Sequence, residues 1–161
     1  MKCKTRIKEL LISIIVLLSL LSCGEPDAQK ERAKSIFPKG EKITSDHFTG
    51  EVWLHMFVRD DSTLNAAVGN VTFEAGARTK WHLHRGGQIL IITDGVGWYQ
   101  EKGSARREVH EGEVITCLPN LEHWHGASSE QSMSHMAMSI NTERGEVVWG
   151  KEVSEEEYMA D

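Results

Sequence analysis

From residue 50 onward, short runs of β-branched and aromatic residues alternate with turn-forming residues. Runs of this kind, bounded by Gly, Asp, Asn or Pro, predict strands joined by tight turns. The predicted strands are Val52–Val58, Ala66–Phe73, Trp81–His84, Gln88–Thr93, Gly97–Gln100, Arg106–His110, Val114–Leu118, His123–Ala127, Met133–Ile140 and Val147–Trp149. Many short strands at such spacing favour an all-β sandwich or barrel built as a single domain.

Glycines mark the predicted turns, among them Arg85-Gly86-Gly87 and Asp94-Gly95. The turn at Asp94-Gly95 is expected to separate two strands. Helical patterns are confined to Asp27–Ser35 and Ser154–Tyr158, so short helical segments are expected only near the two ends of the chain.

The first residues have the pattern of a targeting segment. Four basic residues within positions 2–8 precede the apolar stretch Leu10–Leu21. As a helix this stretch spans only about 18 Å, against about 30 Å for a bilayer core, so it predicts a signal peptide and not a permanent anchor. It ends in Leu20-Leu21-Ser22-Cys23-Gly24, which resembles the bacterial lipobox, where the cysteine is lipidated and becomes the new N-terminus. The alternative is a plain secretory signal with an incidental cysteine at its boundary.

The lipobox interpretation divides the chain into a signal peptide at 1–22, a polar tether at 23–42 and a folded domain at 43–161. It predicts an exported protein that a lipid on Cys23 anchors to the bacterial envelope. Cys3 would leave with the signal, so Cys117 would have no disulfide partner within the chain. Because Cys117 lies in an apolar strand pattern, we expect a buried strand residue and not a nucleophile.

Composition narrows the class of protein further. The chain has 161 residues, of which 40% are apolar and 26% charged, values that fit one globular domain. Its net charge is −6 and no basic run lies inside the body of the chain, so nucleic-acid binding has no electrostatic support. Eight histidines are present, unevenly spread, and they carry the candidate chemistry.

Two pairs of histidines have the spacing of alternate strand positions. On a strand, His82 and His84 face the same side, and so do His123 and His125. If the Arg85-Gly86-Gly87 turn closes a hairpin, Gln88 lies opposite the first pair. Three imidazoles and one amide oxygen would then converge inside a barrel.

Such a donor set favours a divalent metal ion. Imidazole suits Mn, Fe, Co, Ni, Cu and Zn, whereas an amide oxygen favours a harder ion. Four protein ligands on an octahedral ion would leave two positions open for chemistry. The alternative is a scatter of unrelated surface or core histidines.

The two histidine pairs stand in motifs that resemble those of the cupin superfamily. The first motif runs from Gly76 through His82-Leu83-His84 to Gln88 and Gly95, with Gln88 in place of the usual Glu. The second motif contains Gly112-Glu113, Pro119-Asn120 and His123, with Glu113 and Asn120 in place of the usual Asp and Gly.

The resemblance implies a small single-domain cupin, a double-stranded β-helix or jelly-roll barrel. The metal ligands that it implies are His82, His84, Gln88 and His123. Asn tolerates a positive φ, so we expect the turn at Asn120 to survive the substitution.

A narrower resemblance is to the bacterial cupin hydroxynitrile lyases, a group of manganese-dependent, mandelonitrile-lyase-like proteins. It rests on Gly76–His82, on the run 123–127 (HWHGA) and on Gln88, and extends from about Asp46 to Tyr158. It implies Mn²⁺ ahead of Fe²⁺, a small-molecule substrate, His125 and His135 as catalytic residues, and a homodimer or homotetramer. Arg85-Gly86 departs from the Pro-Leu pair common at this place in the family.

The expected reaction is a metal-dependent lyase reaction on a small hydroxy or carbonyl compound. Because Gln88 and imidazoles are uncharged, a divalent ion would keep its full charge and act as a stronger Lewis acid than beside a Glu ligand. A neutral His125 would take the hydroxyl proton of a cyanohydrin, and a protonated His135 would hold or reprotonate the departing cyanide.

Two other functions stay open at this point. One is a metal-dependent dioxygenase, and the other is a non-enzymatic lipoprotein that binds a small ligand. Outside the motifs, we expect Trp81 and Trp124 in the core or an interface, Arg78 in solvent, and Thr79 as a candidate for lining the pocket.

Overall fold

The computed structural model describes residues 35–160, which form a compact unit of their own. The predicted signal peptide, Cys23 and all but the last residue of the helix expected at Asp27–Ser35 lie outside the described residues. The strands are β1 (Glu41–Lys42), β2 (Phe48–Thr49), β3 (Val52–Asp61), β4 (Ala66–Phe73), β5 (Arg78–Thr79), β6 (His82–Leu83), β7 (Gln88–Glu101), β8 (Arg107–His110), β9 (Val114–Cys117), β10 (His123–Ala127), β11 (Met133–Ile140) and β12 (Val148–Trp149). A 3₁₀ turn, η1 (Thr142–Arg144), and a short helix, α2 (Glu155–Met159), complete the unit.

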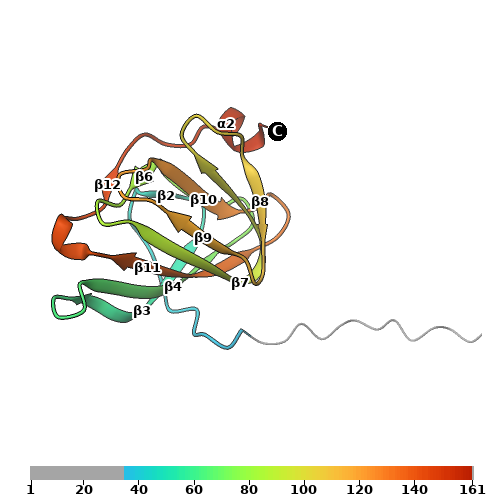
Figure 1. The fold of residues 1–161 in the computed structure, drawn as a ribbon. Helices are drawn as coiled ribbons and strands as arrows, with labels where there is room; N and C mark the ends of the chain where they lie inside the picture. The colour runs from blue at the N-terminus through green and yellow to red at the C-terminus, as the bar shows by residue number, and fades with distance from the viewer. Residues whose placement is uncertain (1–34, 161) are drawn as a thin grey trace, which may run out of the picture. The chain divides into compact units, whose positions relative to one another are not determined.

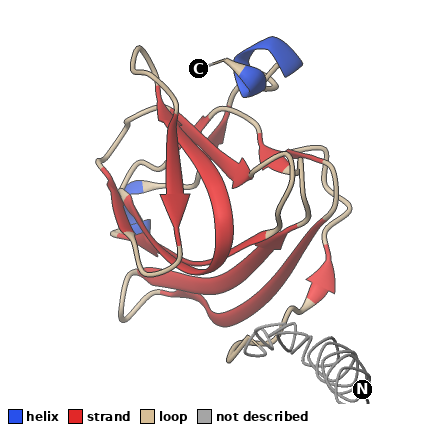
Figure 2. Cartoon of the chain, turned by 90° about the vertical axis from the view of Figure 1, so that its right-hand side faces the viewer, coloured by secondary structure: helices blue, strands red, loops and turns tan. Residues whose placement is uncertain are grey.

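The strands form one curled antiparallel sheet whose two halves share β7 (Figure 1). The first half of β7 pairs with β11 and β9, and β11 continues through β4 and β3 to β1. The second half of β7 pairs with β10 and β8, and β10 in turn pairs with β5 and β6. Figure 2 shows how the strands curl around a common interior. The predicted all-β jelly-roll architecture is confirmed.

The turn predicted at Asp94-Gly95 is wrong, because β7 runs through this position without a break. Opposite it, Ser134 pairs with Asp94 and His135 pairs with Ile92, so Thr93 is one extra residue in β7. Gly95 adopts a φ of +78° here, and a Cβ at this position would lie 1.9 Å from the carbonyl oxygen of Ser132. The glycine therefore marks a bulge that bends β7 from one half of the sheet into the other.

The interior of the curled sheet is the main hydrophobic core. Side chains from both halves alternate inward, as the burial pattern of β7 shows. Its fully buried members include Val52, Phe73, Leu90, Ile92 and Val109. Cys117 belongs to the same cluster, which confirms the expectation of a buried strand residue, and burial raises the pKa of its thiol to about 11.

A second cluster packs the C-terminal segment against the outside of the barrel. It contains Trp81, Trp124, Val153 and Tyr158, so the prediction that the two tryptophans are core residues is confirmed. Ser154 caps α2 by accepting a hydrogen bond from the Glu157 amide, in a complete capping box.

Arg78 holds this C-terminal segment in place, and the expectation that it is solvated is wrong. Its side chain is 5% exposed, and its guanidinium donates to the carbonyl oxygens of Gly76 and Val153 and to the Glu155 carboxylate at 2.6 Å. The same guanidinium stacks 4.4 Å from the ring centre of Tyr158.

The N-terminal end of the described unit is already part of the sheet. Glu41 and Lys42, the last residues of the predicted tether, pair with Leu54 and Trp53 of β3. Among residues 35–160, no helix has the length and apolarity needed to cross a membrane.

Candidate metal centre

His82 and His123 face each other across two antiparallel strands. They are direct partners in the pairing of β6 with β10, and their side chains are fully buried with ring centroids 4.4 Å apart. Each ring donates from Nδ1 to the main-chain carbonyl two residues earlier, at 2.9 Å: His82 to Lys80 and His123 to Leu121. Because a carbonyl can only accept, Nδ1 carries the proton, and the Nε2 lone pair of each ring is free for a metal ion.

The side chain of Gln88 extends toward His123 from the other half of the sheet. It pairs with Cys117 of β9 and Ser139 of β11, and its Oε1 lies 3.4 Å from Nε2 of His123. Since His123 carries its proton on Nδ1, these two facing atoms are both acceptors. A cation between them satisfies both lone pairs, so this pair of residues fits a bound metal.

The hairpin expected at Arg85-Gly86-Gly87 does not form, and the strand partners of Gln88 are Cys117 and Ser139 and not the first histidine pair. β6 pairs with β10 and β12, and not with β7. The segment crosses from one half of the sheet to the other, which brings Gln88 toward His123 across the interior of the barrel.

His84 lies at the edge of this group. Its ring centroid is 5.4 Å from that of His82 and 6.0 Å from that of His123. A hydrogen bond of 3.3 Å joins His84 Nδ1 to Ser139 Oγ. Among the His, Cys, Asp and Glu side chains of residues 35–160, ligand atoms come close enough to hold a metal ion in the group His82, His123 and His125, whose nitrogens all lie within 4.8 Å of one another. His84 is not part of this group.

His125 and His135 form a second pair of buried imidazoles beside the first. Their rings meet edge-on with centroids 4.8 Å apart, and Phe73 packs against both. Nδ1 of His125 and both ring nitrogens of His135 are buried without a hydrogen-bond partner among the described residues. Buried polar atoms are normally satisfied, so these three nitrogens point to a ligand or solvent molecule in the cavity.

Burial keeps the imidazoles neutral. It lowers the pKa of His82, His123 and His125, and it lowers the pKa of His84 and of His135 to about 4. Neighbouring histidines lower the pKa of His82, His84 and His125 further. Neutral imidazole is the form that binds metals, and it is also the form that acts as a base.

These side chains surround one small cavity of about 120 Å³. Its polar wall consists of Thr79, His82, His84, Gln88, His125 and His135, and its apolar wall of Phe48, Val71, Phe73, Ala137 and Trp149. Thr79 also accepts a hydrogen bond of 3.2 Å from the His125 amide, which fixes the strand that carries His125. The cavity thus combines candidate ligands, candidate bases and an apolar surface.

Some residues of the cavity could not be singled out from the sequence. Trp149 is the cross-strand partner of His82, and its ring lies 4.9 Å from the imidazole. Phe48 contributes from β2, a two-residue strand. The sequence predicts a strand at Val147–Trp149 and none at Phe48–Thr49, and it identifies neither Trp149 nor Phe48 as part of the cavity wall. Only the folded arrangement reveals these contacts.

Comparisons with known proteins agree with this geometry. Residues 69–139 match the family model described as Cupin domain. The (R)-mandelonitrile lyase of Granulicella tundricola is 40% identical over 117 residues, which is 73% of this chain and 89% of that protein.

Solved structures give the same fold. A cupin-like protein from Thermotoga maritima is 46% identical, with a TM-score of 0.76 over 78% of this chain and 95% of that chain. A cupin 2 conserved barrel domain protein from Rhodopseudomonas palustris is 15% identical, with a TM-score of 0.57 over 69% of this chain and 74% of that one. The second likeness speaks for the fold alone.

Proposed function

The chain belongs to the cupin family, and we propose on this basis that it is a metal-dependent lyase of the hydroxynitrile-lyase type. It would cleave or form a carbon–carbon bond in a small hydroxy or carbonyl compound. The observation that carries the proposal is the cavity in which His82, Gln88, His125 and His135 converge. The 40% identity to an enzyme named (R)-mandelonitrile lyase supports the same reaction class.

In this proposal His82, His84, Gln88 and His123 hold one divalent ion. Their donors are uncharged, so the ion keeps its full positive charge, and bound there it would supply the Lewis acidity that acidifies a substrate hydroxyl. The resemblance to the manganese-dependent hydroxynitrile lyases favours Mn²⁺ ahead of Fe²⁺, and imidazole nitrogens with one amide oxygen fit either ion.

His125 acts as the base. It is neutral because burial lowers its pKa, and it lies in the cavity wall beside His82. For a cyanohydrin, His125 accepts the hydroxyl proton while the bond to the nitrile carbon breaks and its electron pair leaves with cyanide. The carbonyl forms at the same time, and return of the proton to cyanide gives hydrogen cyanide, which balances the reaction.

His135 acts as a neutral hydrogen-bond donor toward the departing anion. The sequence had pointed to a protonated His135, but burial lowers its pKa to about 4, so the ring is uncharged near neutral pH. A neutral imidazole still carries one N–H group, and neither nitrogen of His135 has a partner among the described residues. One of them is therefore free to donate into the cavity.

The experiment that tests the reaction is turnover of racemic mandelonitrile by the Mn²⁺-loaded protein. We expect benzaldehyde and cyanide in equal amounts, without oxygen uptake, and loss of turnover when the metal is removed. Oxygen consumption without cyanide release would instead support the alternative of a metal-dependent dioxygenase. If the metal-loaded protein neither releases cyanide nor consumes oxygen, the result would support the alternative of a non-enzymatic protein that binds a small ligand.

We also propose that the enzyme is exported and held at the envelope by a lipid on Cys23. The basic residues, the apolar stretch and the Ser22-Cys23-Gly24 boundary support this location. The test is fractionation of cells expressing the full chain and a Cys23→Ser variant. Membrane association of the original chain and its loss in the variant are expected, whereas equal release of both would contradict the proposal.

A further inference from the structure

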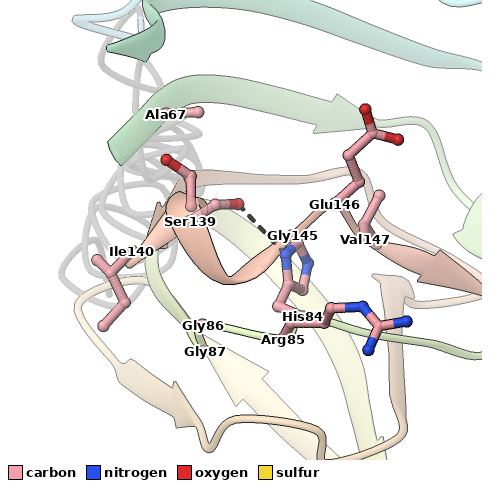
Figure 3. A pocket seen from close by; sticks show the side chains of 11 residues that line it. Ala67, His84, Arg85, Gly86, Gly87, Ser139, Ile140, Gly145, Glu146 and Val147 are labelled. Atoms are coloured by element: carbon pink, nitrogen blue, oxygen red, sulfur yellow. Dashed lines mark hydrogen bonds between the residues drawn. The ribbon is translucent and has the colours of Figure 1, made fainter. Parts of the chain in front are cut away.

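A second pocket lies directly beside the candidate metal centre (Figure 3). It has a volume of about 260 Å³. The residues lining it are Ala67, His84, Arg85, Gly86, Gly87, Ser139, Ile140, Thr142, Gly145, Glu146 and Val147. Three segments thus form it: the end of β11 with η1 and the loop that follows, the crossing segment after β6, and the start of β4.

His84 is common to this pocket and to the cavity of the metal centre. In Figure 3 its ring stands in the pocket with Nδ1 bonded to Ser139 Oγ. The two cavities are therefore neighbours that share one imidazole, and a molecule with its reacting group in the smaller cavity would have to pass this ring to reach the larger pocket. The smaller cavity, at about 120 Å³, is somewhat smaller than the roughly 150 Å³ cavity that holds a benzene molecule, so a substrate with a larger organic part needs further space.

The pocket wall depends on glycines that let its segments approach closely. A Cβ on Gly86 would lie 2.0 Å from the carbonyl oxygen of Ile140. A Cβ on Gly145, which has a φ of +118°, would lie 2.8 Å from Cδ of Arg85. The aliphatic stem of Arg85 thus runs over the Gly145 backbone, and this contact positions the guanidinium beside the pocket.

Arg85 has an exposed side chain, and none of residues 35–160 forms a hydrogen bond or ion pair with its guanidinium. The other charged residue of the lining is Glu146, and in Figure 3 its carboxylate points away from the guanidinium. A planar guanidinium presents paired N–H donors that match the two oxygens of a carboxylate. With the divalent ion of the proposed function nearby, positive charge outweighs the single negative charge of Glu146.

We propose that this pocket is the site for the organic part of the substrate, and that Arg85 selects substrates bearing a carboxylate remote from the reacting carbon. The apolar surface of Ala67, Ile140 and Val147 would pack against the body of such a molecule. The inference rests on the proposed function in taking the cavity beyond His84 as the reaction centre. It names the substrate class as a carboxylated hydroxy or carbonyl compound.

The test compares two probes of nearly the same shape, the anionic 4-formylbenzoate and the neutral 4-formylbenzamide. Their affinities for the metal-loaded protein are measured by titration calorimetry at low and high salt. We expect the carboxylate to bind about fivefold more tightly, the contribution that one exposed ion pair can make, and this preference should shrink as salt is added. Arg85→Gln should abolish the preference, whereas Arg85→Lys should retain part of it.

Arg59→Gln is the matched control, because Arg59 lies on β3 outside both cavities. Its preference should equal that of the original protein. Equal binding of the two probes, no binding of either, or a preference that persists in Arg85→Gln would overturn the proposal. If the carboxylate preference depends on Arg85 but the protein cleaves no cyanohydrin, the lyase function would be contradicted while the proposed carboxylate site would still be supported.

Discussion

His82 and His123 are direct cross-strand partners, and each donates from Nδ1 to the carbonyl oxygen two residues earlier in the chain. The same local geometry therefore sets the tautomer of both rings and turns both Nε2 atoms into free acceptors. Gln88 Oε1 is a third acceptor and lies 3.4 Å from Nε2 of His123. Three acceptor atoms therefore lie close together in the interior of the barrel, and none of the three can donate a hydrogen bond to another. This arrangement is the physical basis for a metal-dependent function.

The role of His125 can be separated from that of a metal ligand. One of its nitrogens lies within 4.8 Å of nitrogens of His82 and His123, yet the proposed ligand set leaves it free to act as a base. We expect His125→Ala to keep its bound metal and to lower kcat for mandelonitrile by about 10²- to 10⁴-fold, the usual range for a general base. Loss of the metal together with activity would show that His125 is a ligand.

The neutral charge of Gln88 should matter for rate more than for metal binding. Gln88→Glu would place a negative charge on the ion and weaken its Lewis acidity. We expect bound metal to be retained and kcat to fall by about tenfold, or about 1.4 kcal/mol in the barrier. Gln131→Glu, which adds the same charge at an exposed position, is the control. An unchanged or higher kcat in Gln88→Glu would refute this account of the donor set.

The buried His135 predicts a pH dependence of stability in the metal-free protein. Its pKa falls from an ordinary value of 6.5 to about 4 in the folded state, so below pH 6.5 the unfolded chain binds the proton first. The free energy of unfolding should therefore decrease as pH falls from 6.5 toward 4, by up to about 1.4 kcal/mol per pH unit for this group. Above pH 6.5 this contribution is constant.

His135→Leu removes one titrating ring and should make the decrease shallower, as followed by urea unfolding at a series of pH values. Four other histidines, whose pKa values burial also lowers, should keep contributing. His110→Asn, which changes an exposed histidine on β8 outside the cavity, is the matched control variant. If His135→Leu and the original chain lose stability in parallel, the pH dependence has another origin.

Arg78 should be a determinant of stability and not of catalysis. Arg78→Met keeps the stem but loses the hydrogen bonds to Gly76, Val153 and Glu155. The expected cost is about 2–3 kcal/mol in the free energy of unfolding, because buried carbonyls lose charged donors. Arg144→Met, at an exposed position of η1, should cost little. A metal content reduced by Arg78→Met in the folded protein would contradict this division of roles.

The sequence predicts most strands because hydrophobic alternation is a local property. Ala66–Phe73, His123–Ala127 and Met133–Ile140 have the bounds that alternation predicts. β7 is different, since Asp94-Gly95 has the local chemistry of a turn and only the pairing with β11 makes it a bulge. A local pattern cannot distinguish these two outcomes, because the deciding partner lies far away in the sequence.

For the candidate site, too, the sequence predicts what depends on local spacing and not what depends on distant strand partners. The spacing of the histidines and the resemblance to cupins identify His82 and His84, which the fold brings to one cavity, and His123, which packs against His82. The position of Gln88, across the barrel and not across a hairpin, depends on which strands pair. The neutral state of His135 also depends on burial, which no local pattern reveals.

The most direct test of the central claim is the metal content of the purified protein, measured by elemental mass spectrometry after reconstitution with Mn²⁺ or Fe²⁺. The proposed site predicts about one ion per chain. It also predicts loss of that ion in the His82→Ala/His123→Ala double variant, with retention in His110→Ala. No bound metal in the original chain, or equal metal in the double variant, would contradict the claim that this barrel holds a catalytic metal ion at these histidines.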